Sequence, residues 1–220
     1  MKLKVSLVLN IIIVFLVITA SVMMFAKIRL MGGDVLLETS RIGMFKFFTV
    51  DSNIFMGLVS FIFIIKEIGI IKGKEKEIPK NLYILKLAAT TSVTLTFITV
   101  FGYLGFIAEG GVLVLLKNSN LFFHLIIPVV SIITFIFFEK TNKINFKSTF
   151  LGIIPMIIYG VIYTINVLIH LNGNKVDPVY DFYYFVQGGI QQVFIVVPIM
   201  FIITYIISFI LWKINRTRDM

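Results

Sequence analysis

The chain has 220 residues, of which 59% are hydrophobic and only 14% charged, and its formal net charge is +9. An ordinary soluble domain is about 45–50% apolar and about 25% charged, so the excess apolar surface is expected to face lipid, which excludes a soluble enzyme, a disordered tail and a nucleic-acid-binding module. The chain holds no cysteine and two histidines, so thiol catalysis, disulfides, iron–sulfur clusters and cysteine-bound zinc are excluded, and no metal or cofactor is expected.

Six apolar segments are long enough to cross a hydrocarbon core, which takes about 20 residues. They lack the period-2 alternation of membrane β-barrel strands. The first segment follows two lysines, as a signal peptide would, but its apolar run of about 20 residues exceeds the usual 7–15. The sequence predicts an all-α integral membrane protein, a six-helix bundle forming one domain over residues 1–220. The expected spans are 5–26, 44–65, 83–108, 121–138, 149–171 and 190–212.

Lysine and arginine in the short connections predict the orientation, because cytoplasmic connections carry the excess of these residues. Of the 20, 14 fall on the side of both termini, counting Lys86 in the connection before the third span, and 6 fall on the other side. Both termini are therefore expected in the cytoplasm of a multi-pass protein, most simply in a bacterial cytoplasmic membrane. The segment 172–189, rich in Tyr and Phe, is expected outside, as an aromatic belt at the interface or as a lid over a site.

Polar residues concentrate in the outer halves of five spans. Thr49, Ser52 and Asn53 share one helical face, at i, i+3 and i+4, and Thr49 lies about 8 Å below the outer end of its span. His124 enters the fourth span at a similar depth. Because polar groups in lipid gather at helix contacts or functional sites, we expect a pocket here. Its other expected members are Asp51, Tyr103, Tyr163, Asn166 and Gln191.

Asp51 is interpreted as the only acid well inside a span. It points about 200° away from Thr49 around the helix. A lone charged carboxylate in lipid costs about 2.5–3.5 kcal/mol, so Asp51 is expected to be hydrogen-bonded, protonated or paired with a cation. It either ties helices together or belongs to the site. Thr49 likewise has an ordinary alternative, since a helical threonine often bonds its own backbone at i−4.

Two motifs in these spans resemble those of a known family. Residues 48–53, Phe-Thr-Val-Asp-Ser-Asn, and residues 124–128, His-Leu-Ile-Ile-Pro, resemble the Phe-Thr-x-x-Ser-Asn and His-x-x-x-Pro motifs of uncharacterised six-pass bacterial membrane proteins. These proteins are similar to the animal androgen-induced and androgen-dependent multi-pass proteins, threonine hydrolases that cleave fatty acid esters of hydroxy fatty acids. The resemblance implies a catalytic role for Thr49 and His124. Further matching positions are Pro155, Tyr159, Tyr163 and the loop 177–181.

The chemistry of ester hydrolysis fits these residue types. A threonine hydroxyl is a weak nucleophile until a base accepts its proton, and neutral histidine is the best-matched base near pH 7. Asn53, on the Thr49 face, could donate to the oxyanion. The expected function is therefore hydrolysis of a lipid or fatty acyl ester that enters sideways from the bilayer. The oligomeric state stays open.

Three other functions compete with hydrolysis. A non-catalytic lipid-binding or sensor protein would use the same pocket. A small transporter is less favoured, because inverted repeats, broken helices and acids near the midplane are not found in the sequence. A bis-histidine haem protein would require His124 and His170 to face each other at equal depth.

Overall fold

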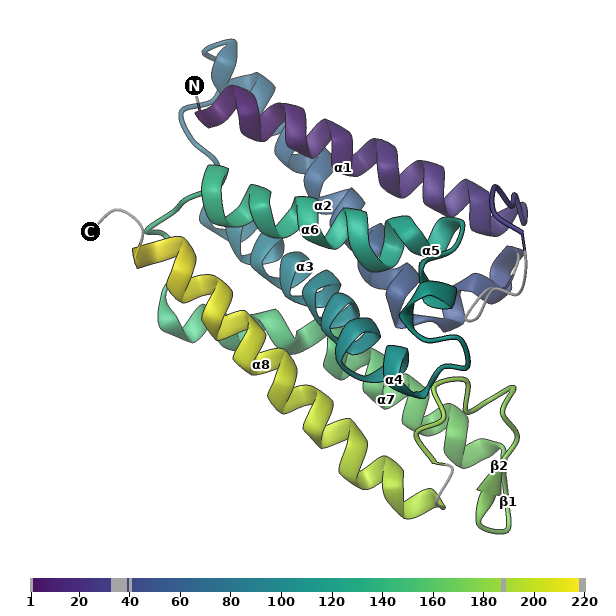
Figure 1. Cartoon of the computed structure of the whole chain (residues 1–220). Helices are drawn as coiled ribbons and strands as arrows, with labels where there is room; N and C mark the ends of the chain where they lie inside the picture. Colours follow the sequence, from purple (N-terminus) through teal and green to yellow (C-terminus); the bar gives the residue numbers. More distant parts are fainter. Residues whose placement is uncertain (1, 33–38, 40, 187–188, 218–220) are drawn as a thin grey trace.

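A computed structural model of the chain describes residues 2–32, 39, 41–186 and 189–217 (Figure 1). It contains six helical segments that are long and apolar enough to cross a membrane, which confirms the expected all-α six-helix architecture. They comprise Lys2–Phe25, Phe48–Ile71, Lys80–Ile107, Ser119–Phe138, Phe146–Ile169 and Ile190–Arg216.

The first two spans are continuous helices, α1 (Lys2–Phe25) and α2 (Phe48–Ile71). The second begins four residues later than expected, because Arg41–Lys46 forms a separate 3-10 helix, η1. The third span begins three residues earlier than expected, directly after Pro79, whose extended backbone and missing N–H suit a helix start. It consists of α3 (Lys80–Thr99), the π-helical turn η2 (Val100–Leu104) and α4 (Gly105–Ile107).

The fourth span is interrupted by wider turns. It runs through α5 (Ser119–Leu121), the π-helical η4 (Phe122–Ile126), α6 (Ile127–Ile133) and the π-helical η5 (Thr134–Phe138). Pro128 follows η4 in the first turn of α6, where its ring would clash with the carbonyl four residues back in a regular helix. The wide turn before Pro128 therefore has a local cause, and His124 lies within it.

The last two spans begin with 3-10 turns. The fifth consists of η6 (Phe146–Ile153) and α7 (Ile154–Ile169), and the sixth of η7 (Ile190–Gln192) and α8 (Val193–Thr217). A short 3-10 helix, η3 (Val112–Leu116), precedes the fourth span. A small antiparallel hairpin, β1 (Leu171–Asn172) and β2 (Lys175–Val176), follows α7. Its two-residue turn places Gly173 at a φ of +63°, as such turns require.

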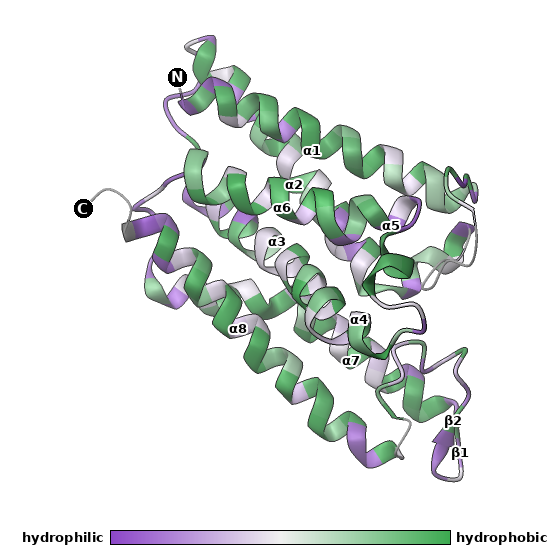
Figure 2. Ribbon diagram, in the orientation of Figure 1, coloured by the Kyte–Doolittle hydropathy of each residue, from purple (hydrophilic) through white to green (hydrophobic). Residues whose placement is uncertain are grey.

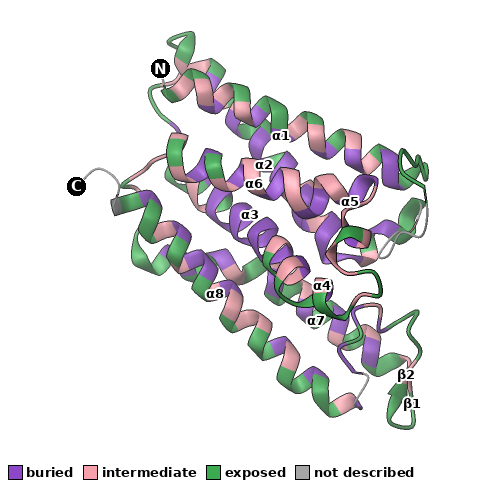
Figure 3. Ribbon diagram, in the orientation of Figure 1, coloured by how far each residue is buried: buried purple, intermediate pink, exposed green. Residues whose placement is uncertain are grey.

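The third span lies at the centre of the bundle, in contact with α2, α6, α7, α8 and η6 (Figure 1). In Figure 2, α3 is pale between strongly hydrophobic neighbours, and in Figure 3 most of it is buried. Its apolar window is 67% buried, against 28–39% for the other spans. Alanine, serine and threonine occupy seven of the nine positions 88–96, and such small residues let neighbouring helices approach closely. The centre of the bundle is therefore its least hydrophobic helix.

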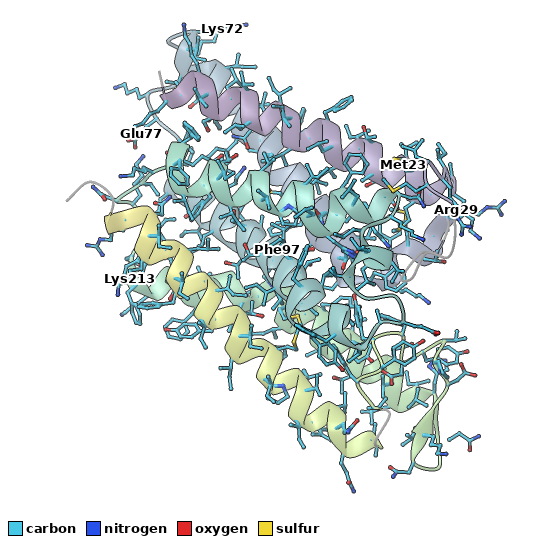
Figure 4. All side chains as sticks on the ribbon, in the orientation of Figure 1. Met23, Arg29, Lys72, Glu77, Phe97 and Lys213 are labelled. Carbon is cyan, nitrogen blue, oxygen red and sulfur yellow. The ribbon has the colours of Figure 1, made fainter. Side chains whose placement is uncertain are left out.

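Both termini lie at one end of the bundle (Figure 1). Figure 4 labels Lys72, Glu77 and Lys213 at this same end and Met23 and Arg29 at the opposite one. We call the end with the termini the inner end and the other the outer end, following the orientation expected from the sequence.

A buried polar network joins the spans in the inner half. The Lys86 ammonium donates to Asn10 Oδ1 at 2.5 Å and to Ser60 Oγ at 2.8 Å, and it lies 3.2 Å from Glu139 Oε1. Asn10 Nδ2 donates to Glu139 Oε1 at 2.8 Å and to Glu67 Oε2 at 3.4 Å. All five residues are at most 3% exposed. The network therefore ties α1, α2 and α3 to the residue that follows η5.

This network corrects two interpretations of the sequence. Lys86 does not belong to the cytoplasmic connection, because α3 starts at Lys80 and places Lys86 almost two turns inside the helix. Without Lys86, 13 lysine and arginine residues fall on the side of both termini and 6 on the other side, so the expected orientation is unchanged. Asp51 is also not the only acid within a span, since Glu67 lies inside α2 and is buried.

We predict that Lys86→Met strongly destabilises the protein. Removing one partner of a buried ion pair leaves an uncompensated charge and typically costs about 3–5 kcal/mol. Lys66→Met is the matched control, because Lys66 pairs with Glu75 at 2.7 Å with both side chains about one-third exposed, where such pairs contribute about 0–1 kcal/mol. Thermal unfolding in detergent measures both variants. Equal melting temperatures for the two variants would show that the network contributes little.

Candidate functional site

A small cavity lies in the outer half of the bundle, beside the start of α2. Its volume is about 40 Å³, which accommodates a water molecule or two but no acyl chain. Thr49, Thr96 and Thr99 line it together with Tyr159 and Tyr183. The remaining wall is apolar, formed by Phe48, Leu95, Val100, Leu104, Met156, Phe185 and Met200. The cavity is therefore a water-sized space in apolar surroundings with hydroxyl-bearing side chains in its wall.

Two tyrosines fix the start of α2 and so place Thr49. The N-cap residue, Phe47, makes no side-chain capping bond, and the hydroxyl oxygen of Tyr183 accepts the Phe48 N–H at 2.9 Å instead. Tyr159 donates to the Lys46 carbonyl at 2.6 Å. Burial raises the pKa of Tyr183 to about 12, so this hydroxyl stays protonated at neutral pH. Side chains far away in the sequence thus satisfy a helix end that has no local cap.

The hydroxyl of Thr49 differs from those of other threonines in the spans. Six of these bond the carbonyl four residues earlier, as isolated helical threonines commonly do; they are Thr90, Thr94, Thr96, Thr134, Thr164 and Thr204. Thr49 makes no such bond within the described residues and lines the cavity instead. This difference follows from position, because Phe45, four residues before Thr49, lies outside α2, and the buried hydroxyl of Thr91 likewise has no partner among the described residues.

Ser52 and Asn53 bind backbone on the same face as Thr49. Ser52 Oγ donates to the Thr49 carbonyl at 3.1 Å and lies 3.2 Å from Thr96 Oγ1. Asn53 Nδ2 donates to the Thr49 carbonyl at 2.7 Å and to the Phe123 carbonyl at 3.2 Å. The amide nitrogen of Asn53 is thus engaged by two carbonyls, one on α2 and one on η4. This bond pattern makes Asn53 a tie between the helices that carry Thr49 and His124.

His124 is buried, with 1% of its surface exposed, and its Nδ1 lies 2.6 Å from the Leu115 carbonyl. Because a carbonyl only accepts, Nδ1 carries the proton, and Nε2 of the neutral ring carries the lone pair. This is the tautomer that a general base requires. No hydrogen bond joins His124 to Thr49 in the described part of the chain, and His124 does not line the Thr49 cavity. Asn53 joins the backbone of Thr49 to that of Phe123, the residue before His124, and does not contact the His124 ring by a hydrogen bond.

Two of the other expected site residues anchor the outer segment 172–189. Tyr163 donates a short hydrogen bond to Asp181, whose carboxylate also accepts the N–H groups of Phe185 and Val186. Asn166 donates to the Tyr180 carbonyl at 3.0 Å. The anchored segment places Tyr183 and Phe185 in the cavity wall. The described part of this segment therefore forms part of the cavity wall.

The remaining expected residues lie apart from the cavity. Tyr103 is 41% exposed and contacts Phe185, with ring centroids 6.3 Å apart. Gln191 is exposed in η7. His170 stacks on Tyr180 at a centroid distance of 3.5 Å, so its ring packs against the outer segment. Asp51 faces the opposite side of α2, in the wall of a separate groove.

Sequence reasoning missed part of the cavity wall. Tyr159 was noted as a matching position of the family motif, but its bond to the start of α2 was not expected. Thr96, Thr99 and Tyr183 were not singled out at all. Among the described residues, no group of three or more metal-ligating side chains could hold a metal ion.

No family model, curated protein or solved structure matches this chain.

We predict that Tyr183→Phe destabilises the outer end of α2. The change leaves the buried Phe48 N–H without its acceptor, which typically costs about 1–3 kcal/mol. Faster amide hydrogen exchange in the first turn of α2 and a lower melting temperature would report it. Tyr184→Phe is the control, because Tyr184 is 45% exposed. Unchanged exchange in Tyr183→Phe would mean that the cap does not hold this turn.

Proposed function

We propose that the protein is an integral membrane hydrolase of lipid (fatty acyl) esters, with Thr49 as nucleophile and His124 as general base. The observation that carries this proposal is the position of Thr49 in the first turn of α2, where it lines a water-sized cavity together with Thr96 and Thr99. The resemblance to threonine hydrolases falls on this same residue.

The reaction proceeds in two steps. In the first, Thr49 Oγ1 attacks the acyl carbonyl carbon while His124 Nε2 takes the hydroxyl proton, and the leaving alcohol departs with that proton. In the second, a water molecule attacks the acyl-threonine, again with His124 as base, and releases the acid and free Thr49. Each proton transfer needs donor and acceptor about 2.6–3.2 Å apart or joined by one water. Because His124 does not line the cavity, the two side chains must approach each other when substrate binds, and catalytic hydrogen bonds commonly tighten only then.

The geometry around the pair supports these roles. The Leu115 carbonyl holds the His124 ring in the tautomer that has its lone pair on Nε2. The Asn53 amide nitrogen donates to the carbonyls of both Thr49 and Phe123, and these two bonds hold α2 and η4 in a fixed relative position. The Asn53 nitrogen is engaged there, and the Thr96 hydroxyl donates to the Ser92 carbonyl, so the hydroxyl of Thr99 in the cavity wall is the better candidate for an oxyanion donor.

A non-catalytic lipid-binding or sensor protein is the second candidate. Two observations favour it: Thr49 and His124 are not hydrogen-bonded within the described residues, and the Thr49 cavity has no room for an acyl chain. A small transporter gains less support. The buried acids Glu67 and Glu139 lie close to the inner ends of their spans, away from the midplane, where transporters bind substrate.

We predict that Thr49→Ala and His124→Ala each remove most hydrolysis of a long-chain p-nitrophenyl ester by the purified protein. The double variant should be little worse than either single one, because residues that act as a unit are grossly non-additive. Thr49→Ser should retain activity, since the hydroxyl remains.

Thr94→Ala is the matched control for Thr49→Ala. Both threonines are 8% exposed, but the Thr94 hydroxyl bonds the backbone of its own helix, so this variant should keep full activity. Full ester hydrolysis by Thr49→Ala would overturn the proposal. Absence of any esterase activity in the wild type, with retained binding of the ester, would favour the lipid-binding alternative.

A further inference from the structure

A groove runs along the lipid-facing surface between α2 and α7, outside the Thr49 cavity. It consists of two adjoining cavities of about 350 Å³ and about 230 Å³ that share Asp51, Tyr159 and Ile162 in their walls. The larger and deeper part is apolar apart from Asp51 and Ser52 and reaches Pro155. The outer part ends at the first turns of α2 and the last turns of α7. The groove therefore has the length and polarity of an amphiphile, with an apolar inner part and a polar outer end.

Most polar groups in the groove wall are already bonded to the protein. Tyr159 donates to a backbone carbonyl, Tyr163 donates to Asp181, and Asn166 donates to the carbonyl of Tyr180. The Lys46 ammonium lies about 5 Å from the ring centroids of Phe47 and Phe182, as a cation–π contact.

Asp51 is the exception. Its carboxyl group lines both parts of the groove, yet no hydrogen bond or ion pair of its side chain exists within the described residues. It is half-buried in a membrane span, where an unpaired ionisable group is costly and marks a functional site by default. A carboxylate accepts hydrogen bonds only. An N–H or O–H donor from outside the chain would complete the hydrogen bonding of the ionised group.

We propose that this groove binds a single-chain lipid amphiphile whose head group carries an N–H or O–H donor for Asp51. The acyl chain lies in the apolar part between α2 and α7, beside Ile158 and Ile162. Both of these residues are more than half exposed and give the chain access from the bilayer. The head group lies at the level of Asp51, with Lys46 at the outer end to meet an acceptor on the same head. Two head groups share this chemistry, a primary amine and a hydroxyl.

The groove site does not depend on ester hydrolysis. Phe48 and Tyr159 line both the groove and the Thr49 cavity, and their ring centroids are 5.1 Å apart. This aromatic pair separates the two spaces. A ligand in the groove therefore touches Asp51 without reaching Thr49, and loss of hydrolysis in a Thr49 variant leaves the groove site unaffected.

Photocrosslinking tests the proposal with the full chain in phosphatidylcholine nanodiscs, since the choline head group has no N–H donor. The probes are three diazirine-bearing C16 chains that end in a primary amine, a hydroxyl or a methyl ether. We expect saturable labelling of α2 and α7 by the amine, the alcohol or both. The methyl ether should bind more weakly by a factor of at least about ten, because it cannot donate a hydrogen bond to Asp51.

Two variants of Asp51 distinguish the sources of the donor. Asp51→Leu should reduce labelling by every donor probe about tenfold or more. Asp51→Asn should also reduce labelling by the amine probe, because an ammonium needs the negative charge. It should leave labelling by the alcohol probe unchanged, because a hydroxyl needs only a hydrogen-bond acceptor. Glu109→Gln is the control, because it removes an exposed carboxylate at the outer end outside the groove. Wild-type labelling in Asp51→Leu, or equal labelling by the methyl ether, would overturn the proposal and indicate ordinary contact with bulk lipid.

A second pair of variants tests the place of binding. Ile162→Trp fills the point where the two parts of the groove meet and should abolish saturable labelling. Ile165→Trp adds the same bulk on α7 at a half-exposed position that does not line the groove, and it should label like the wild type. Equal labelling of the two tryptophan variants would show that the amphiphile binds elsewhere. Thermal unfolding of each variant confirms that it is folded.

Discussion

The buried ammonium of Lys86, paired with the Glu139 carboxylate, is the constraint on which the arrangement of the bundle depends. A charge without solvent is tolerated only when it is paired and hydrogen-bonded. Here the partners come from other spans: Asn10, Ser60 and Glu139. The central helix is therefore fixed in rotation and depth at its inner end. Its small residues further along then let the neighbouring helices pack closely around it, and its outer end supplies the Thr96 and Thr99 wall of the cavity.

The sequence was sufficient for the number and class of the helices, because length and hydropathy decide whether a segment crosses lipid. It was insufficient to predict that Lys86 and Glu67 are buried. Both lie near the ends of apolar runs, where a charge normally extends to the interface, and their sequence neighbours do not show that a buried Asn10 and Glu139 meet them. The later start of α2 has a similar origin, since hydropathy alone does not distinguish a short 3-10 helix from the first turns of a span.

The candidate site was also predictable from the sequence only in part. Helical periodicity correctly placed Ser52 and Asn53 on the face of Thr49, and the outer segment contributes Tyr183 to the cavity wall. The direction of His124 was not predictable, because it depends on a π-helical turn before Pro128 and on a carbonyl from η3. The cap on α2 comes from Tyr183, 135 residues away. Contacts of this kind depend on tertiary packing, which local sequence rules do not contain.

Many polar groups in these spans have partners within the bundle: six threonines bond their own helices, Lys86 has several partners, and the tyrosines bind backbone groups or Asp181. Buried side-chain atoms without a partner also occur, among them those of Ser21, Thr91 and Ser131. Thr49 and Asp51 lie two residues apart, on opposite sides of one helical turn, and both line cavities. The first turn of α2 therefore faces two different environments: a water-sized cavity on the Thr49 side and a larger, lipid-accessible groove on the Asp51 side, with the Phe48–Tyr159 ring pair between them.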